Sequence, residues 1–228
     1  MGAVGRRINE FLKSRWFYPL AFVACALPLA LLLKEAIPVL VPAIWPDAVV
    51  PWTGDLGVNP VETMLHATGR NALRLLLVTL AITPIRRLTG WNRVQLVRRM
   101  VGVWSFVYAL CHFAIYVTFD QLGDVHAIFD DVVKRRFIFV GMFAFVVLLV
   151  LTVTSTNGMM RRLGRRWQRL HRLVYAAAVA GGIHFVWGQK ADIREPLVWF
   201  AILVVLLGVR VAWAVRRRRA RLSPAVSH

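Results

Sequence analysis

The chain has 228 residues, of which 58% are hydrophobic, and a mean hydropathy of +0.60. This composition excludes a soluble globular domain and indicates an integral membrane protein. The formal net charge of +18 does not indicate a nucleic-acid binder, because the arginines lie between long apolar runs rather than on one polar face. The two cysteines, Cys25 and Cys111, lack the spacing of a zinc site or a disulfide framework, so we interpret them as small core residues.

The chain begins with a basic head, residues 1–16, followed by an apolar run at 17–33 that is long enough to cross a bilayer. A signal peptide has the same composition. We favour an uncleaved anchor, because cleavage would leave an odd number of spans and disrupt the charge pattern described below. Residues 34–68 are rich in proline and tryptophan and are predicted to form the longest loop, at the level of the lipid headgroups.

Five further apolar segments are predicted to cross the membrane. Together with the first segment they give an all-α, polytopic bundle of six transmembrane helices. The second of the six is short and is predicted to end at Pro84. The five segments are residues 69–83, 101–119, 137–154, 167–187 and 197–213.

The distribution of charge predicts the orientation of this bundle. The head, the loops at 84–100 and 155–169 and the tail hold 19 of the 29 lysine and arginine residues and only one acid, Glu10. Positive residues stay on the cytoplasmic side, so both termini are predicted to be cytoplasmic. The basic face could in addition dock anionic lipid or an acidic partner, although orientation alone explains the charge more simply. The predicted parts are a basic cytoplasmic head at 1–16, a transmembrane domain at 17–213 and a basic cytoplasmic tail at 214–228.

Histidines in the third and fifth spans are the strongest functional signal. Hydrocarbon satisfies neither the donor nor the acceptor of a neutral imidazole, and ionisable groups in spans usually mark a pathway or a ligand. Imidazole is also a common axial ligand of haem iron. Both spans run outward, which places His112 and His184 at a similar depth toward the outer side. We predict that these two bind one haem iron from opposite sides, with an interhelical hydrogen bond as the alternative.

His171 indicates a second, inner site with an iron ligand of its own. It lies thirteen residues before His184, which on an ideal helix separates the two side chains by roughly 20 Å and rotates them roughly 140° apart. They share a face only if the helix is irregular, for which Gly181 and Gly182 are the plausible place. The third span offers no second histidine. The inner site is therefore five-coordinate, uses an unusual ligand, or holds something other than haem.

Several arginines are candidate partners of a cofactor carboxylate. Arg70 and Arg74 follow His66 at helical spacing and lie on one helix face. No carboxylate is nearby in the sequence, so a haem propionate is one candidate anion and snorkelling to the headgroups is the alternative. Arg99, thirteen residues before His112, is a further candidate propionate partner. His66 belongs to the same candidate cofactor-binding set, although a hydrogen-bonding surface role is the simpler interpretation.

A second group of arginines precedes His171 on the predicted cytoplasmic side. Anchoring by positive charge is the simpler explanation. A docking site for a flavin phosphate or a donor protein is the alternative. The group comprises Arg161, Arg162, Arg165, Arg166 and Arg169.

Three segments resemble one known family: TGRNALRLLLVTLAITPIRR, RRMVGVWSFVYALCHF, and TSTNGMMRRLGRRWQRLHRLVY followed by IHFVW. They resemble the haem-binding membrane subunit of the bacterial periplasmic methionine sulfoxide reductase system, the MsrQ family of the ferric reductase-like transmembrane superfamily. The resemblance covers about residues 60–213. It implies a six-span b-type cytochrome of the bacterial inner membrane that holds one or two haem b groups and FMN.

The resemblance also implies an electron relay rather than a catalytic subunit. The family passes electrons from the quinone pool or a cytoplasmic flavin reductase to a periplasmic molybdopterin-containing subunit, which reduces methionine sulfoxide in oxidised envelope proteins. The family's histidines match His112, His171 and His184. The wider superfamily has two histidines on each of the third and fifth spans, whereas Arg99 stands here in place of the fourth.

Two alternatives remain open at this point. The first is a stand-alone transmembrane ferric or cupric reductase that uses the same haem. A nicotinamide–flavin domain is absent after the sixth span, so such an enzyme would need a separate donor. The second is a proton-coupled transporter with a histidine relay and no haem, which the lack of intramembrane carboxylates disfavours.

Overall fold

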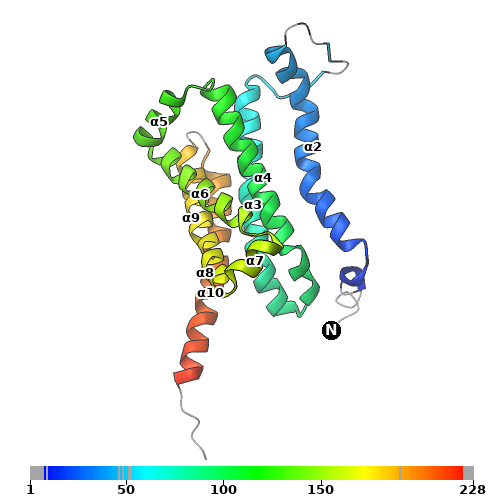
Figure 1. The fold of residues 1–228 in the computed structure, drawn as a ribbon, viewed down its shortest axis with the longest axis vertical. Coiled ribbons are helices and arrows are strands. Elements are labelled where there is room, and N and C mark those ends of the chain that lie inside the picture. The colour runs from blue at the N-terminus through cyan, green and yellow to red at the C-terminus, as the bar shows by residue number, and fades with distance from the viewer. Residues whose placement is uncertain are drawn as a thin grey trace, which may run out of the picture.

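The computed structural model describes residues 8, 10–45, 47, 49–50, 53–189 and 192–222, and within these residues it is built from helices without strands (Figure 1). The all-α prediction is therefore confirmed. The six long helices are α2 (Phe17–Ile44), α3 (Pro60–Thr89), α4 (Arg98–Ile115), α6 (Arg136–Val153), α9 (Val174–Gly188) and α10 (Arg194–Leu222). The shorter helices are η1 (Asn92–Val97), η2 (Tyr116–Asp120), α5 (Val125–Lys134), α7 (Asn157–Leu163), α8 (Arg165–Leu170) and η3 (His171–Leu173).

Four of the described segments are long and apolar enough to cross a membrane, which makes the chain a multi-pass membrane protein. By the same measure α9 is too short, with 15 residues, and α3 carries polar residues along its 30. The four segments are Phe17–Pro42, Asn92–Asp120, Arg136–Val153 and Arg194–Arg219.

Two predicted helix ends are wrong, and proline is the reason in both cases. The helix that was expected to stop at residue 33 continues as α2 through Pro38 and Pro42. The loop therefore begins after Ile44, eleven residues later than predicted. Helix α3 continues through Pro84 to Thr89 and ends at Gly90, whose φ of 75° is left-handed. Proline is tolerated inside apolar helices, because neighbouring helices and local adjustments compensate for the lost hydrogen bond.

The bundle is organised as two closely packed helix pairs, α3 with α4 and α6 with α9. Helix α3 also contacts α9, α10 and α2, and α2 lies at the edge of the bundle (Figure 1). The largest core cluster joins α3, α4, α6, α9 and α10. Where α9 crosses this core it presents small buried residues, Ala177, Ala178 and Gly182, which allow close approach between membrane helices.

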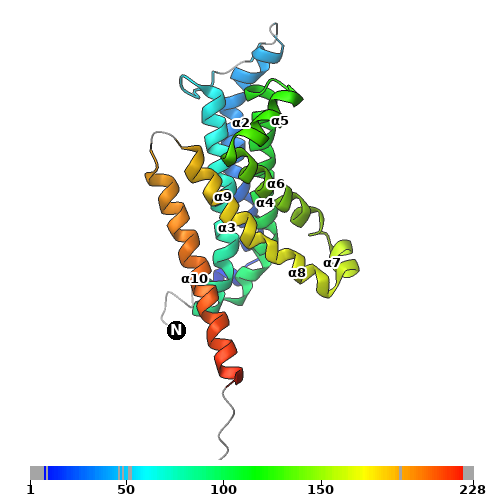
Figure 2. The same ribbon diagram turned by 90° about the vertical axis from the view of Figure 1, so that its left-hand side faces the viewer.

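The irregularity in the fifth apolar segment lies at its start. Helix α9 is continuous through Gly181 and Gly182, so the expected irregularity at these glycines is wrong. Instead, the three residues from His171 to Leu173 form the 3₁₀ turn η3 between α8 and α9. Figure 2 shows α8 and α9 as one inclined run, with α7 beyond the end that α8 forms.

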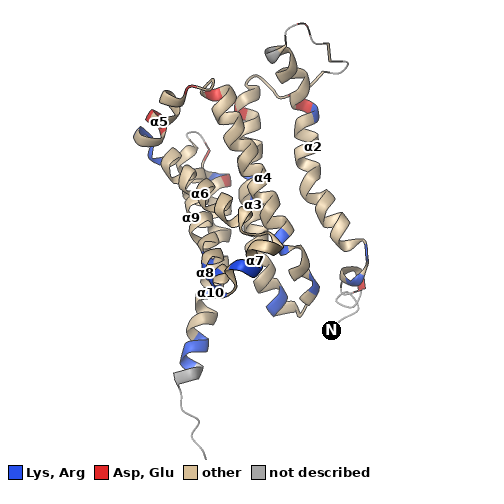
Figure 3. Ribbon diagram, viewed as in Figure 1, with Lys and Arg blue, Asp and Glu red and all other residues tan. Residues whose placement is uncertain are grey.

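Charge separates along the long axis of the bundle. Figure 3 shows most basic residues on α7, on the neighbouring ends of α3 and α4 and on the end of α10, and most acidic residues toward the opposite end. The start of α2 and the end of α10 thus lie at the same, basic end of the bundle (Figure 1). Helix α10 runs past Trp213 to Leu222, so part of the predicted tail is helical.

We predict that Gly182→Val destabilises the bundle by about 1–3 kcal/mol, the usual cost of overpacking. A Cβ at Gly182 would lie 2.9 Å from Phe200 Cδ2 and 3.3 Å from Leu203 Cδ2 on α10. The measurement is the thermal unfolding midpoint in detergent. Gly208→Val is the matched control, because a Cβ there has nothing within 4 Å. Equal midpoints for the two variants would contradict this packing.

Candidate cofactor site

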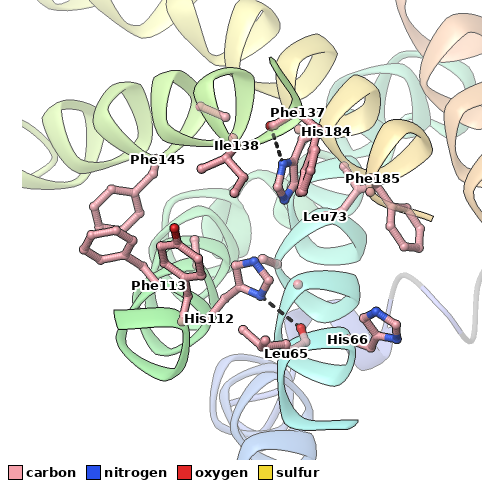
Figure 4. A pocket seen from close by; sticks show the side chains of 18 of the residues that line it. Leu65, His66, Leu73, His112, Phe113, Phe137, Ile138, Phe145, His184 and Phe185 are labelled. Carbon is pink, nitrogen blue, oxygen red and sulfur yellow. Dashed lines mark hydrogen bonds between the residues drawn. The ribbon is translucent and has the colours of Figure 1, made fainter. Parts of the chain in front are cut away.

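A cavity of about 660 Å³ lies between α3, α4, α6 and α9. Its volume falls within the range of small-molecule and cofactor sites, about 300–1,000 Å³. Apolar and aromatic side chains form most of its wall, including Leu73, Phe113 and Phe145, and a few polar groups converge on it (Figure 4). This combination of a largely apolar wall and few polar groups is typical of a site for a large organic ligand.

The two polar rings inside the cavity are His112 of α4 and His184 of α9. Their ring centroids are 6.1 Å apart, with the ring planes at 84° to each other. Figure 4 shows the two imidazoles side by side between the helix pairs. The two histidines, which were predicted to face each other from different helices, thus lie next to each other.

Both imidazoles are held in the same tautomer by main-chain carbonyls. His112 Nδ1 lies 2.9 Å from the Leu65 carbonyl oxygen, and His184 Nδ1 lies 2.7 Å from that of Phe137. A carbonyl only accepts hydrogen bonds, so each Nδ1 carries the proton and each Nε2 keeps its lone pair. Among the described residues neither Nε2 has a hydrogen-bond partner. An Nδ1–H bonded to a carbonyl with Nε2 free is the usual state of a metal-ligating histidine.

Two glycines make room for these rings, and sequence reasoning missed them. A Cβ on Gly69 would lie 3.1 Å from His112 Nδ1, and a Cβ on Gly141 would lie 2.6 Å from His184 Nδ1. Each glycine stands four residues after the residue whose carbonyl accepts the imidazole proton. In a helix the side chain at that position leans back over this carbonyl, so only glycine leaves it open to a ring from another helix.

The spacing of the two rings suits a metal held between them. Bonds from a metal to imidazole nitrogen are about 2 Å long, so two rings on opposite sides of one metal have centroids about 6 Å apart. The described residues form no cluster of three or more histidine, cysteine or acidic side chains that could hold a bare metal ion. Two histidines in a cavity of this size therefore fit a metal whose remaining ligands come from a planar organic cofactor.

Arg70 and Arg74 pair with a carboxylate that is distant in the sequence, whereas the sequence had suggested a haem propionate or the lipid headgroups as their partners. Arg70 Nη1 donates to Glu195 Oε2 at 3.2 Å, and Arg74 Nη2 donates to Glu195 Oε1 at 3.0 Å. Arg74 also stacks on Trp199, 5.1 Å from its ring centroid. Arg70 lines the cavity, so Glu195 of α10 holds an arginine at the cavity wall. The only sign of Glu195 in the sequence was the presence of an acid at the start of the sixth span.

Comparisons with known proteins place the chain in one family. The family model for the ferric reductase like transmembrane component matches residues 68–182. A protein of Rhodospirillum rubrum is 46% identical over 205 residues, covering 90% of this chain and 91% of the relative. One of Herminiimonas arsenicoxydans is 49% identical over 169 residues, covering 73% and 78% respectively. Both relatives are named heme-binding subunit MsrQ of protein-methionine-sulfoxide reductase. The chain belongs to the MsrQ family. No solved structure matches it significantly.

Of the residues proposed for MsrQ from the sequence, His171 does not line the cavity. Its ring stacks on Trp167, with centroids 3.9 Å apart, and its Nδ1 lies 3.2 Å from the Trp167 carbonyl oxygen. Its Nε2 lies 3.2 Å from Ser155 Oγ. That hydroxyl also donates to the Leu151 carbonyl at 2.7 Å and has a single proton. The Leu151 carbonyl and the lone pair of His171 Nε2 therefore compete for the single Ser155 proton.

The remaining two candidates lie apart from the histidine pair. Arg99 Nη1 donates to Asn157 Oδ1 at 2.6 Å and does not line the cavity. His66 does line it, but Figure 4 shows its ring well away from the paired histidines. Of the predicted set, the structure thus places His112, His184, Arg70 and His66 around one cavity.

A polar cluster at the outer end of the MsrQ cavity was not predicted. The π-helix η2 follows α4 directly and brings Tyr116 and Asp120 to the cavity wall. The Tyr116 hydroxyl donates to Asp131 Oδ2 at 3.1 Å, and Arg135 Nε pairs with Asp131 Oδ1 at 3.0 Å. Single π turns inside α-helices are frequent at functional sites.

We predict that Glu195→Gln lowers the stability of this MsrQ protein by about 1 kcal/mol, because two half-exposed ion pairs are lost at once. The thermal midpoint should fall by about 2–4 °C. Glu10→Gln, which removes an exposed acid at the other end of the bundle, should leave it unchanged. A midpoint for Glu195→Gln that matches the control would show that the clamp contributes nothing to stability.

Proposed function

We propose that this chain is a b-type cytochrome subunit that relays electrons to a methionine sulfoxide reductase, with one haem b bound between His112 and His184. The observation that carries the proposal is the pair of uncommitted Nε2 atoms on two helices beside one cavity. The relatives' name, which specifies a heme-binding subunit, supports it. Bound there, haem supplies reversible one-electron redox chemistry.

The protein's own residues hold and orient the cofactor in this proposal. His112 and His184 would bind the iron through Nε2, and the carbonyls of Leu65 and Phe137, which fix the tautomer, would raise the basicity of these ligands. The aromatic wall excludes water and so helps to set the potential. Arg70 lies at the wall and is our candidate partner for a haem propionate, and its guanidinium would then donate to both the propionate and Glu195.

The orientation of the chain follows from its charge. We propose six spans, with α3 and the run from α8 to α9 as the two beyond the four that composition identifies. The basic end, where α2 begins and α10 ends, is then cytoplasmic in a bacterial inner membrane (Figure 3). The haem cavity adjoins the acidic end of the bundle, with Asp120 and Glu62 in its wall. This places the proposed haem on the periplasmic side, next to its acceptor.

The proposed partners come from the family. Electrons enter from the quinone pool or a cytoplasmic flavin reductase and leave to a periplasmic molybdopterin-containing catalytic subunit. The exposed arginines of α7 and α8, Arg161 to Arg169, are the candidate docking site for the donor or for the phosphate of FMN. Arg74 and His66 contribute to haem binding only indirectly in this proposal. Arg74 does so by holding Glu195, and His66 does so as part of the cavity wall.

We predict that a chemically reduced sample is reoxidised when the catalytic subunit and methionine sulfoxide are both added under anaerobic conditions, and not with either alone. The measurement is the decay of the reduced haem absorbance in a stopped-flow spectrometer. Rapid reoxidation by chelated ferric iron without the partner would favour the stand-alone metal reductase. A folded preparation without haem would favour the transporter.

We predict that His112→Ala and His184→Ala each abolish the low-spin b-type spectrum of the outer haem, because each removes one of two axial ligands. Reduced-minus-oxidised visible spectra and extracted haem per protein are the measurements. His66→Ala is the matched control and should retain both signals.

His171→Ala reports on the second, inner centre. Partial loss of haem would establish that centre, and full retention would limit the protein to one haem.

A substitution that spares both histidines tests the same geometry independently. Gly141→Ala places a Cβ where the His184 ring lies and should reduce haem content, whereas Gly102→Ala meets only ordinary contacts with Thr79, at 3.7 Å or more. Full haem occupancy in Gly141→Ala, or an unchanged spectrum in His112→Ala, would remove the histidine pair as the ligands.

A further inference from the structure

A second pocket, of about 490 Å³, lies at the basic end of the bundle, between the ends of α3, η3, α9 and α10. Five of the nine residues around it are arginines, and none is acidic. The family resemblance and the haem proposal assign nothing to this pocket. The five arginines are Arg87, Arg172, Arg210, Arg217 and Arg218.

The arginines are held together by aromatic groups and carbonyls rather than by acids. Arg210 donates to the Tyr175 hydroxyl at 2.8 Å and to the Leu80 carbonyl, yet its buried Nε has no partner. Arg87 stacks on Trp213, 4.9 Å from its ring centroid. Arg217 and Arg210 lie close enough to repel the Arg87 guanidinium. A cluster of positive charges that includes an unpaired N–H donor is suited to bind an anion.

The pocket lies at the depth of the lipid headgroups. Trp213 is nineteen residues after Arg194, the start of α10, which is about 29 Å along an α-helix. The hydrocarbon core of a bilayer is about 30 Å thick, so the two ends of this stretch lie at the two interfaces. A tryptophan at that position is typical of an interfacial anchor.

We propose that this pocket binds the phosphate headgroup of an anionic phospholipid. Arginines bind phosphate oxygens in pairs of parallel hydrogen bonds, and basic pockets between transmembrane helices recognise acidic headgroups. Val211 and Val204 lie seven and fourteen residues before Arg218 and therefore on the same face of α10, and at 62 and 54% exposure they offer an apolar surface on which acyl chains can lie. This apolar continuation favours a lipid over a soluble phosphate ester. The proposal requires only that the chain crosses a membrane and is independent of the proposed electron transfer.

The test measures lipid retained by the detergent-purified full chain in native mass spectrometry, with phosphatidylglycerol and phosphatidylcholine as probes. Wild type should bind phosphatidylglycerol selectively. The double variant Arg172→Gln/Arg217→Gln removes two pocket charges, and within the described residues neither side chain makes a hydrogen bond or an ion pair. It should weaken binding about 30-fold, equivalent to about 2 kcal/mol. Arg161→Gln/Arg162→Gln removes the same charge from α7 and should bind as wild type does.

Three outcomes would overturn the proposal. Equal weakening in the two double variants would mean that diffuse surface charge, rather than the pocket, attracts the lipid. Displacement of the bound lipid by micromolar-range FMN, or binding of FMN or inorganic phosphate without any lipid preference, would assign the pocket to a soluble phosphate. Unchanged binding in both the double variant and Arg218→Gln would exclude the pocket. Haem content and elution profile, measured on every variant, show that the fold is intact.

Discussion

Two hydrogen bonds from imidazole to the main chain determine what the interior of this bundle can bind. A histidine in an apolar interior must satisfy its N–H, and in a helical bundle every carbonyl of a neighbouring helix is already engaged in that helix. His112 and His184 reach the carbonyls of Leu65 and Phe137, both in otherwise helical segments, as second donors. That arrangement requires a glycine one turn later. It leaves each Nε2 without a partner among the described residues, which is the condition for binding a metal.

The two hydrogen bonds are related by an internal repeat that sequence inspection did not reveal. In each case the histidine lies 47 residues after the residue whose carbonyl it contacts. Gly69 and Gly141 occupy matching places, and His112 and His184 are both followed by phenylalanine. The two helix pairs, α3 with α4 and α6 with α9, thus present equivalent ligands from opposite sides. The connections within the two pairs differ in structure although the spacing is equal: η1 joins α3 to α4, whereas α7, α8 and η3 join α6 to α9.

The sequence was sufficient for the features that depend on composition and depth. Apolar length and charge predicted a helical bundle with a basic and an acidic end, and the running direction of the spans predicted that His112 and His184 meet. Contacts between distant segments were beyond its reach. Glu195 lies 125 residues from Arg70, and nothing local indicates that the two meet. The glycines became interpretable only when the ring facing each of them was known. Helix ends were misjudged where proline usually stops a helix in water but not in lipid.

The repeat also explains why the outer and inner halves of the bundle differ. Arg99 and His171 occupy corresponding places in the two helix pairs. Arg99 stands at the place where the wider superfamily has its fourth histidine. Arg99 turns to Asn157, whereas His171 stays beside Ser155 with an Nε2 that a shared hydroxyl satisfies only in part. Clamping an iron requires two such nitrogens facing each other, and the arginine removes one of them. The inner half therefore has at most one histidine to offer, while the outer half has a complete pair. This asymmetry places the complete histidine pair toward the acidic end of the bundle.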